Sequence, residues 1–461
     1  MRKLERTTFE TSREAEYFDK AGLSKQTGQV PSRFSEVVIK ELADNALDAA
    51  EYARVAPEVE ITAQEKRSAL ILSVADNGPG IPPKTVQKML NFNTRTSDKA
   101  LYRSPTRGAQ GNALKTIVGM PHALGSGKNP VLIDSQGARH LIKVVADPVG
   151  ELTKERTIER CQRTTGTRVT VVLPEATQYF TKAELLHWGR AVAVFNPHAF
   201  VKVAGSGLDN YHGESAGRDL AVFYKPLAEG FAKYTPGEPS SAHWYDEAAL
   251  KTLVFSHIRH ARAEGGEDLP LGKFVRQFKG LSSTAKAREV CSHFPEIDRL
   301  SDFEGRGHGV ALLLYWMKQY SKPPPHKALG RLGKDHIRAR LEDFYGHVER
   351  YRYKHFEGYL PSGLPYTFEF AVADVDELGD LFVGVNFSPA FGDPLQDLRL
   401  KGKKYEASGI EEFLEEGFAH PLRDHADDPE SPLTAAVTHV VTPAPLFMEY
   451  GKTRLDLMGR K

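Results

Sequence analysis

The chain has 461 residues, of which 40% are hydrophobic and 26% charged, as expected of a soluble globular protein with more than one domain. Its formal net charge is +1, which excludes a globally basic nucleic-acid binder and limits any such surface to a local patch. The two cysteines, Cys161 and Cys291, exclude a disulfide framework and zinc ligation by cysteine pairs. No apolar run approaches the roughly 18 residues of a membrane span, so we expect a cytoplasmic protein.

An amphipathic helix around Glu41 is the first informative element that we predict. Apolar residues recur along one stripe, and Glu41, Asn45 and Asp48 share the opposite face at i, i+4 and i+7. A carboxylate can take a proton from an attacking water, and a carboxamide oxygen can bind Mg²⁺, which prefers oxygen ligands. A simple solvated face is the alternative interpretation.

A strand predicted over residues 69–75 ends at Asp76 and turns sharply at Asn77-Gly78. An ionised carboxylate there can accept a hydrogen bond from the exocyclic amine of adenine, whereas guanine has a carbonyl at that position. Gly78 and Gly80 allow the backbone to approach a flat base closely. Asp-Asn-Gly is also a common structural turn, so this segment alone leaves both interpretations open.

A glycine-rich segment begins at Arg107, after a stretch over residues 91–106 that is rich in Arg, Lys, Ser and Thr. The glycines lead into an apolar, helix-like run, so backbone N–H groups and the helix dipole would point at an anion. We expect residues 91–106 to close over a ligand; a surface loop before a glycine-capped helix is the alternative. The residues of this segment expected to contact a nucleotide are Arg107, Gly108, Gln110, Gly111, Asn112 and Lys115.

Two common nucleotide motifs are absent from this part of the chain. The phosphate-loop pattern G-x-x-x-x-G-K-[ST] fails because Asn112 follows Gly111, and no Rossmann fingerprint occurs. A β-branched strand over residues 164–174 follows, entered through Gly166 and Thr167.

The order of helix, Asp-x-Gly-x-Gly turn, glycine-rich lid and Gly-Thr strand is similar to that of the GHKL ATPases. These include gyrase B subunits, histidine kinases, MutL proteins and heat-shock chaperones. Within that superfamily the chain most resembles the B subunit of DNA topoisomerase VI. The run of residues 15–23, just ahead of the Glu41 helix, resembles that family's N-terminal strap.

The resemblance implies an α/β (α+β) fold, with a GHKL sandwich of a mixed sheet that carries helices on one face. It also implies ATP and Mg²⁺ as cofactors. By this likeness Glu41 is the general base and Asn45 the magnesium ligand, while Asp48 is a supporting residue. Asp76 is the adenine acceptor, and Thr167 is a second adenine contact.

We expect three domains and a connection. The strap and ATPase domain occupy residues 1–205, and a Gly, Pro and Ser rich connection follows over 206–245. Residues 246–320 are mostly helical in pattern, with helices over 270–278 and 285–291, and resemble a helix-two-turn-helix domain. Residues 321–461 resemble a transducer domain, an α/β unit.

In the last domain we predict strands over 364–373, 380–394 and 435–442, with a long crossover that carries residues 411–416. The resemblance places a phosphate-contacting lysine after the final strand, and the matching residue is Lys452. An exposed terminal lysine is the alternative. A basic stretch with aromatic residues over 326–355 suits a DNA backbone or, about equally, a solvated helix face.

The resemblance further implies a homodimer gated by ATP, a separate DNA-cleaving or effector subunit, and DNA as a partner, without membrane contact. Three functions remain open: a subunit of a topoisomerase-like complex, a stand-alone or defence ATPase that clamps DNA or a protein, and a nucleotide-regulated module without turnover. The sequence identifies neither the partner nor the lid cation that contacts phosphate.

Two related classes fit less well. Too few residues precede Glu41 for the phosphoacceptor helix of a histidine kinase, and the middle segment favours the topoisomerase pattern over MutL. The sequence ends soon after Lys452, so we expect the usual helix that grips the DNA-cleaving subunit to be missing.

Overall fold

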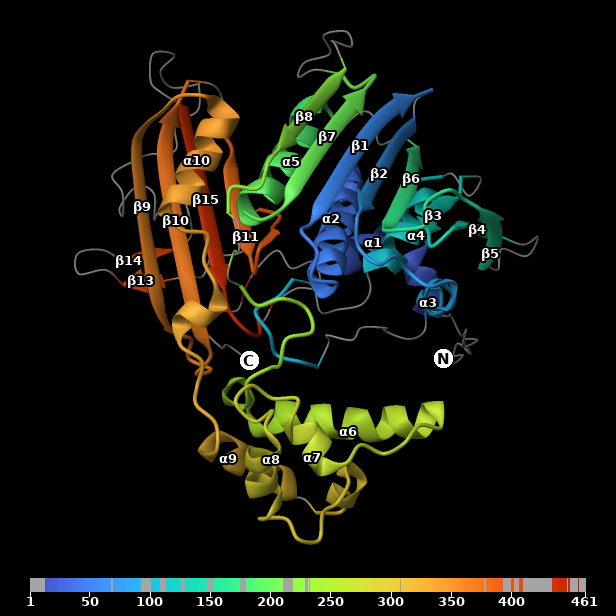
Figure 1. Ribbon diagram of the computed structural model, residues 1–461. Helices are drawn as coiled ribbons and strands as arrows, with labels where there is room; N and C mark the ends of the chain where they lie inside the picture. Colours follow the sequence, from blue (N-terminus) through green and yellow to red (C-terminus); the bar gives the residue numbers. More distant parts are fainter. Residues whose placement is uncertain are drawn as a thin grey trace, which may run out of the picture.

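Figure 1 shows the computed structural model, in which two β-sheets lie side by side next to a small group of helices. The structure describes residues 13–67, 69–92, 101–107, 113–125, 129–146, 152–174, 180–209, 219–228, 231, 233–306, 308–376, 379–392, 399–401, 406–408, 433–445, 447 and 455. No helix within these ranges is both long and apolar enough to cross a membrane.

The first sheet has eight strands in the order β5-β4-β3-β6-β2-β1-β7-β8. Among these strands β1 and β7 pair in parallel, and the other neighbours are antiparallel. The strands are β1 Glu58–Lys66, β2 Ala69–Asp76, β3 Val131–Ser135, β4 Ala138–Ala146, β5 Leu152–Arg160, β6 Thr167–Pro174, β7 Phe200–Ser206 and β8 Leu220–Tyr224. Because β8 belongs to this sheet, the sheet extends beyond residue 205, where we expect the first domain to end.

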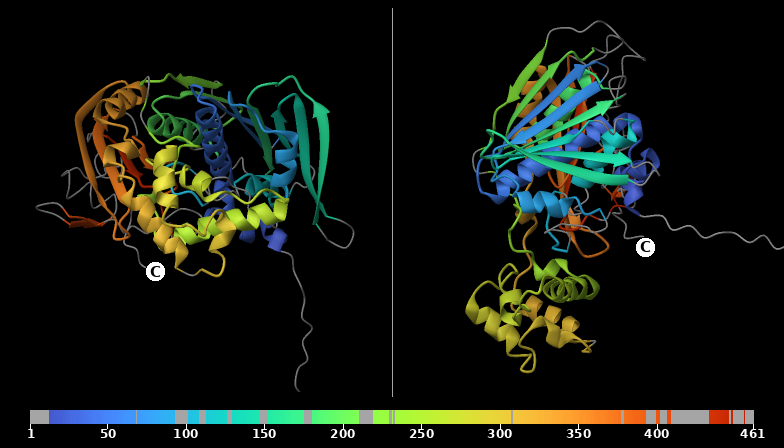
Figure 2. Two further views of the ribbon diagram at one scale, coloured as in Figure 1. Left: turned by 60° about the horizontal axis from the view of Figure 1, so that its bottom comes forward. Right: turned by 90° about the vertical axis from the view of Figure 1, so that its right-hand side faces the viewer.

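Helices cover one face of this sheet, which confirms the predicted fold class (Figures 1 and 2). The long helix α2 packs on β1 and β2, α4 on β4 and β6, and α5 on β7. Every second residue of β6 is buried toward the helices, and the residues between are half-buried. The helices of this part are α1 Lys20–Thr27, α2 Phe34–Tyr52, α3 Pro83–Met89, α4 Ala113–Ala123 and α5 Lys182–Phe195.

The middle part is helical, as predicted, and lies beyond one end of both sheets (Figures 1 and 2). Its helices are α6 Glu247–Glu264, α7 Leu271–Val275, α8 Thr284–Cys291 and α9 Gly309–Gln319. Helix α8 is capped at its first turn, because the Ser283 side chain accepts a hydrogen bond from the Lys286 N–H.

The second sheet has five strands in the order β12-β11-β15-β10-β9. Helix α5 packs against β11 and β12 as well as against β7, so it joins the two sheets. The elements are α10 Lys334–Tyr345, β9 Val348–Tyr359, β10 Pro365–Val375, β11 Leu381–Val385, β12 Ser388–Pro389 and β15 Leu433–Val441. A separate two-stranded ribbon consists of β13 Arg399–Lys401 and β14 Glu406–Ser408.

The strand predicted over 380–394 is interrupted. It consists of β11 and β12, joined by a two-residue turn at Asn386 and Phe387, whose φ angles are 51° and 64°. Positive φ at both central positions is the pattern of a type I′ hairpin turn, and it is costly for a residue as bulky as phenylalanine. The turn is therefore held by tertiary contacts. It borders the cavity that forms the candidate site.

Strand β9 is not predicted from the sequence, because its tyrosines alternate with charged residues instead of aliphatic ones. It is an edge strand that pairs with β10 alone among the described strands. It occupies part of the basic stretch 326–355, whose role in DNA binding stays a prediction. The predicted crossover 411–416 lies outside the described residues.

Candidate functional site

A cavity of about 750 Å³ lies between α2, the turn after β2, α4 and the β11–β12 turn, a volume in the usual range for a small-molecule site. It brings together predicted site residues that are up to 126 positions apart in sequence, from position 41 to position 167. The predicted residues that line it are Glu41, Asn45, Asp48, Asp76, Gly80, Arg107, Lys115 and Thr167. Gly78 lies beside them, whereas Gly108, Gln110, Gly111, Asn112 and Lys452 are outside the described residues.

Asp76 is held in a fixed orientation at the end of β2. Its Oδ1 accepts hydrogen bonds from the N–H of Gly78 at 2.8 Å and of Thr167 at 3.1 Å. The turn is tightly packed, since a Cβ on Gly78 would lie 2.9 Å from the Cβ of Ala49 on α2. Burial raises the pKa of Asp76, and the two backbone donors only partly oppose this. The second oxygen, for which no protein donor occurs among the described residues, can therefore accept one further hydrogen bond.

Gly166 allows β6 to approach this carboxylate. Its φ is 67°, and a Cβ there would lie 1.9 Å from the carbonyl oxygen of Asp76. The Gly166 N–H donates to the Gly78 carbonyl at 2.8 Å, which joins the two turns. The predicted glycine entry into this strand thus has a direct structural reason.

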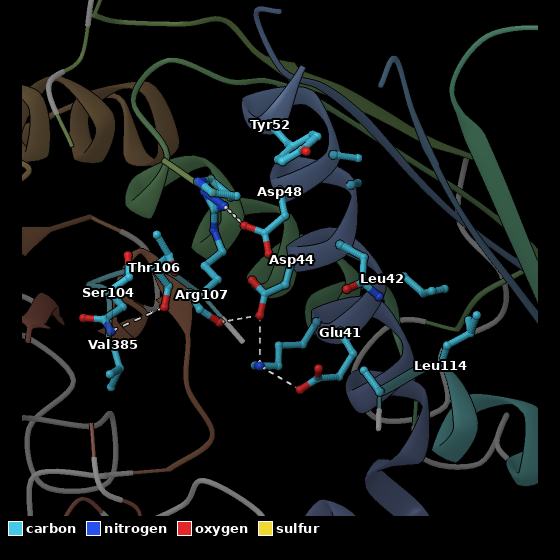
Figure 3. A pocket seen from close by; sticks show the side chains of 18 of the residues that line it. Glu41, Leu42, Asp44, Asp48, Tyr52, Ser104, Thr106, Arg107, Leu114 and Val385 are labelled. Atoms are coloured by element: carbon cyan, nitrogen blue, oxygen red, sulfur yellow. Dashed lines mark hydrogen bonds and ion pairs between the residues drawn. The ribbon is translucent and has the colours of Figure 1, made fainter. Parts of the chain in front are cut away.

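Helix α2 presents Glu41 and Asp48 to the cavity (Figure 3), and Asn45 of the same helix also lines it, as the periodicity predicts. Asn45 is exposed and Glu41 half-buried, so the amide is accessible to a cation in the cavity. The described residues contain no group of three or more His, Cys, Asp or Glu that could hold a metal by themselves. The accessible amide oxygen of Asn45 is a ligand that suits Mg²⁺, which is commonly bound by one or two protein oxygens together with phosphate and water.

Arg107 lines the cavity, but its guanidinium is directed into a buried ion cluster and is fully buried. It contacts Asp48 at 3.0 Å and Glu51 at 3.1 Å, and it donates to the side-chain oxygen of Asn196 at 2.8 Å. Whether Arg107 also contacts phosphate stays a prediction. In this geometry it joins the lid segment to α2.

Glu51 is the centre of that cluster. It also pairs with Lys233 at 2.7 Å and with His198 at 2.9 Å. Burial would raise the pKa of Glu51, but Arg107 and Lys233 outweigh this and lower it. Burial lowers the pKa of Lys233 to about 8, and the neighbouring Arg107 adds to this.

Replacing Arg107 by methionine is expected to lower the free energy of unfolding by about 3 kcal/mol, because the buried carboxylate of Glu51 loses a partner. Thermal and urea unfolding measure this. Arg338→Ala is the matched control: its ion pair with Glu342 is exposed, so a change of at most about 0.5 kcal/mol is expected. Unchanged stability together with lost ATP affinity would instead assign Arg107 to phosphate binding.

Residues 101–107, at the end of the stretch predicted to close over a ligand, are attached to the middle helical part. Tyr102 Oη lies 2.9 Å from Nε2 of His257 on α6. The Arg103 guanidinium donates to the Trp244 carbonyl at 2.6 Å and to Asp246 at 2.9 Å. The helical part is therefore in contact with one wall of the cavity.

Of the two lysines predicted as site residues, the structure describes Lys115 but not Lys452. Lys115 lies on α4, is buried, and donates to the Asn91 carbonyl at 2.6 Å. Lys452 is not described, but Phe447 and Leu455 on either side of it form an isolated antiparallel bridge, and Phe447 lines the cavity.

Sequence reasoning missed three residues that line the cavity or lie beneath it. Lys40 and Asp44 form an ion pair on α2, and Ser388 of β12 donates to Asp44. The i, i+4 spacing of Lys40 and Asp44 is a usable sequence signal. The hydrogen bond from Ser388 to Asp44 joins residues 344 positions apart, and nothing local in the sequence indicates it.

Comparison with known proteins agrees with this geometry. Residues 31–177 match the family described as "Histidine kinase-, DNA gyrase B-, and HSP90-like ATPase". The B subunit of type 2 DNA topoisomerase 6 from Natronomonas pharaonis is 30% identical over 222 residues, covering 45% of this chain and 26% of that protein. Its counterpart from Thermococcus gammatolerans is 27% identical over 341 residues, covering 73% of this chain and 54% of that protein.

The ATPase region of Saccharomyces cerevisiae topoisomerase II aligns over 91% of this chain and 76% of that chain, with 9% identity and a TM-score of 0.38. Similarity at that level adds nothing to the assignment.

Residues 31–177 therefore form a domain of the GHKL ATPase class, and this range contains every predicted site residue except Lys452. Over a longer stretch the chain is similar to the B subunit of type 2 DNA topoisomerase 6, as the sequence motifs predict. The chain spans about half the length of these relatives or less.

Proposed function

We propose that the chain is a Mg²⁺-dependent ATPase whose turnover drives a change in the relative position of its two sheets. The observation that carries this proposal is one cavity lined by Glu41, Asn45, Asp76 and Thr167. These residues supply a base, an oxygen ligand and an adenine-selective acceptor in one place. The match of residues 31–177 to the GHKL ATPase family supports the same conclusion.

Adenine binds against Asp76 in this proposal. The carboxylate, oriented by the N–H groups of Gly78 and Thr167, accepts the exocyclic amine and disfavours the guanine carbonyl at that position. Gly80, with φ of 82°, lies where a side chain would approach Ser135, so a glycine keeps this turn compact beneath the base.

In this proposal, side chains on the cavity face of α2 carry out the hydrolysis. Glu41 accepts a proton from the water that attacks the γ-phosphate, and the Asn45 amide oxygen binds the metal. Bound Mg²⁺ supplies positive charge that neutralises the phosphate oxygens. Lys452, on the segment between Phe447 and Leu455, adds a cation at the γ-phosphate and senses its loss.

The proposal includes a homodimer that closes when ATP binds. The described part of the strap packs on α4: a Cβ on Gly119 would lie 1.7 Å from the Tyr17 carbonyl oxygen. The strap is thus seated on a helix that borders the cavity, and in the proposed dimer it contacts a second copy. DNA and a separate DNA-cleaving or effector subunit are the proposed partners, by similarity to the topoisomerase 6 B subunits.

A defence-type ATPase that clamps DNA or a protein without strand passage is the second candidate. It requires the same cavity and is equally compatible with the match of residues 31–177, so ATP turnover alone does not separate it from the first candidate. Relaxation of supercoiled plasmid by the chain together with its co-purifying partner separates the two. Relaxation supports the topoisomerase-like complex, and ATP turnover on DNA without relaxation supports the clamp.

The proposed function itself is tested with the purified chain. Phosphate release from Mg-ATP and sedimentation with a non-hydrolysable ATP analogue are the measurements. We expect steady turnover and a shift from monomer to dimer. Nucleotide-dependent dimerisation without turnover would reduce the protein to a regulated binding module, and absence of both would contradict the proposal.

A further inference from the structure

Lys40 lies beneath the proposed general base in a buried ion cluster. Its Nζ is 2.8 Å from Oε1 of Glu41 and 3.0 Å from Oδ2 of Asp44 (Figure 3). The lysine side chain is 6% exposed, against 18% for Glu41, so the ammonium group approaches the carboxylate from the protein side. Burial lowers the pKa of Lys40, but the two carboxylates outweigh burial and raise it, so the side chain stays charged.

The ion pair restrains a side chain whose orientation matters for catalysis. A glutamate has three rotatable bonds, and a general base must lie within hydrogen-bond reach of the proton that it accepts. Lys40 fixes one oxygen of Glu41, and Lys40 is itself fixed by Asp44, one helical turn along α2. The position of the base therefore depends on how strongly Lys40 binds Glu41 relative to Asp44.

A residue of the second sheet binds the same carboxylate of Asp44 and so affects this balance. Ser388, the first residue of β12, donates its hydroxyl to Oδ2 of Asp44 at 2.6 Å, the oxygen that also binds Lys40. The turn before Ser388 is held firmly: the Phe387 N–H donates to His439 at 3.1 Å, and Asn386 donates to the Thr442 carbonyl at 2.9 Å. A movement of this sheet relative to α2 therefore moves the hydroxyl away from Asp44.

We propose that Lys40 is the positioning residue of the Glu41 base, and that the β11–β12 turn controls its hold on Glu41 through Ser388 and Asp44. This inference rests on the proposed ATPase function. When the hydroxyl is withdrawn, Oδ2 of Asp44 loses a donor and attracts Lys40 more strongly. Lys40 then releases Glu41, and hydrolysis slows while the nucleotide stays bound. Turnover is thereby limited to one arrangement of the two sheets.

A double-mutant cycle tests this inference in the full chain. Lys40→Met is expected to lower kcat about 10-fold or more and Ser388→Ala about 3-fold, each with the Kd for a fluorescent ATP analogue unchanged. The double variant is expected to be no slower than Lys40→Met alone, since Ser388 acts only through the lysine. Lys40→Arg keeps a cation between the carboxylates and is expected to restore part of kcat.

Asp44→Asn provides a second cycle if Lys40→Met does not fold, because it preserves shape while removing the charge through which Ser388 acts. In that background Ser388→Ala is expected to leave kcat unchanged. Thr438→Val is the matched control in the second sheet, since its buried hydroxyl has no hydrogen-bond partner among the described residues. It is expected to retain wild-type kcat.

Three results would overturn the inference: multiplicative losses in kcat in either cycle, a raised Kd at unchanged kcat for Lys40→Met, or unchanged kcat and Kd in that variant. The second result would make Lys40 a nucleotide ligand. Wild-type protein that neither binds nor hydrolyses ATP contradicts the proposed function instead, so the two failures are distinguishable.

Discussion

Glu41→Gln is expected to lower kcat for ATP hydrolysis by about 100- to 10,000-fold, the usual contribution of a general base. Glutamine has nearly the same shape but does not take a proton from water. The Kd for ATP is expected to change little, because the proposed adenine contact lies on β2 and β6 and not on α2. Phosphate release and equilibrium binding of a fluorescent ATP analogue measure the two quantities separately.

The matched control is Glu36→Gln, a carboxylate on the same helix that binds Arg33 and Trp188 and does not line the cavity. Its kcat is expected to stay near that of the wild type. Equal losses in both variants would mean that the helix, and not a base, had been damaged. Full activity of Glu41→Gln would remove this residue from the mechanism.

Asp76→Asn is expected to weaken ATP binding by roughly 10- to 100-fold, the value of a hydrogen bond to a charged group. The asparagine oxygen can still accept from Gly78 and Thr167, so the turn is retained. Its NH₂ group then faces the adenine amine, which is donor against donor. The same NH₂ group can donate to the guanine carbonyl, so the preference for ATP over GTP is expected to narrow.

Calorimetric titration of both nucleotides into each protein measures this change. Asp134→Asn is the control: this strand carboxylate pairs with Arg139 and does not line the cavity. It is expected to bind both nucleotides as the wild type does. Undiminished ATP affinity in Asp76→Asn would falsify the assignment of the adenine acceptor.

The pH dependence of binding gives an independent check on Asp76. Burial raises its pKa, and only the ionised form accepts the adenine amine. Affinity is therefore complete above that pKa and is lost as the pH falls through it, at higher pH than for an ordinary aspartate. We expect the wild-type Kd to rise as the pH falls, beginning at a higher pH than for an ordinary aspartate, and that of Asp76→Asn to rise less.

Local patterns in the sequence were sufficient for much of the ATPase fold and its site. The helix around Glu41 and the strand that ends at Asp76 are defined by periodicity and turn chemistry, and the structure contains both. Their convergence on one cavity required the resemblance to GHKL proteins, because spacing along the chain does not place β2 beside β6. The structure shows that β2 and β6 pair as antiparallel neighbours.

Other features could not be predicted because tertiary contacts determine them. Phe387 adopts a positive φ that its own type disfavours, and it does so because His439 and Arg107 hold the turn from both sides. The sequence predicts Arg107 as a nucleotide contact, which stays a prediction, but it does not predict that the guanidinium lies against Glu51. Only the folded chain brings that glutamate within reach.

The most direct test of the central claim is a calorimetric titration of the wild-type chain with Mg-ATP and Mg-GTP at neutral pH. We expect one ATP bound per chain and little or no heat from GTP, because the cavity is built around a carboxylate that selects adenine. A flat titration with ATP, or equal affinity for the two nucleotides, would contradict the account.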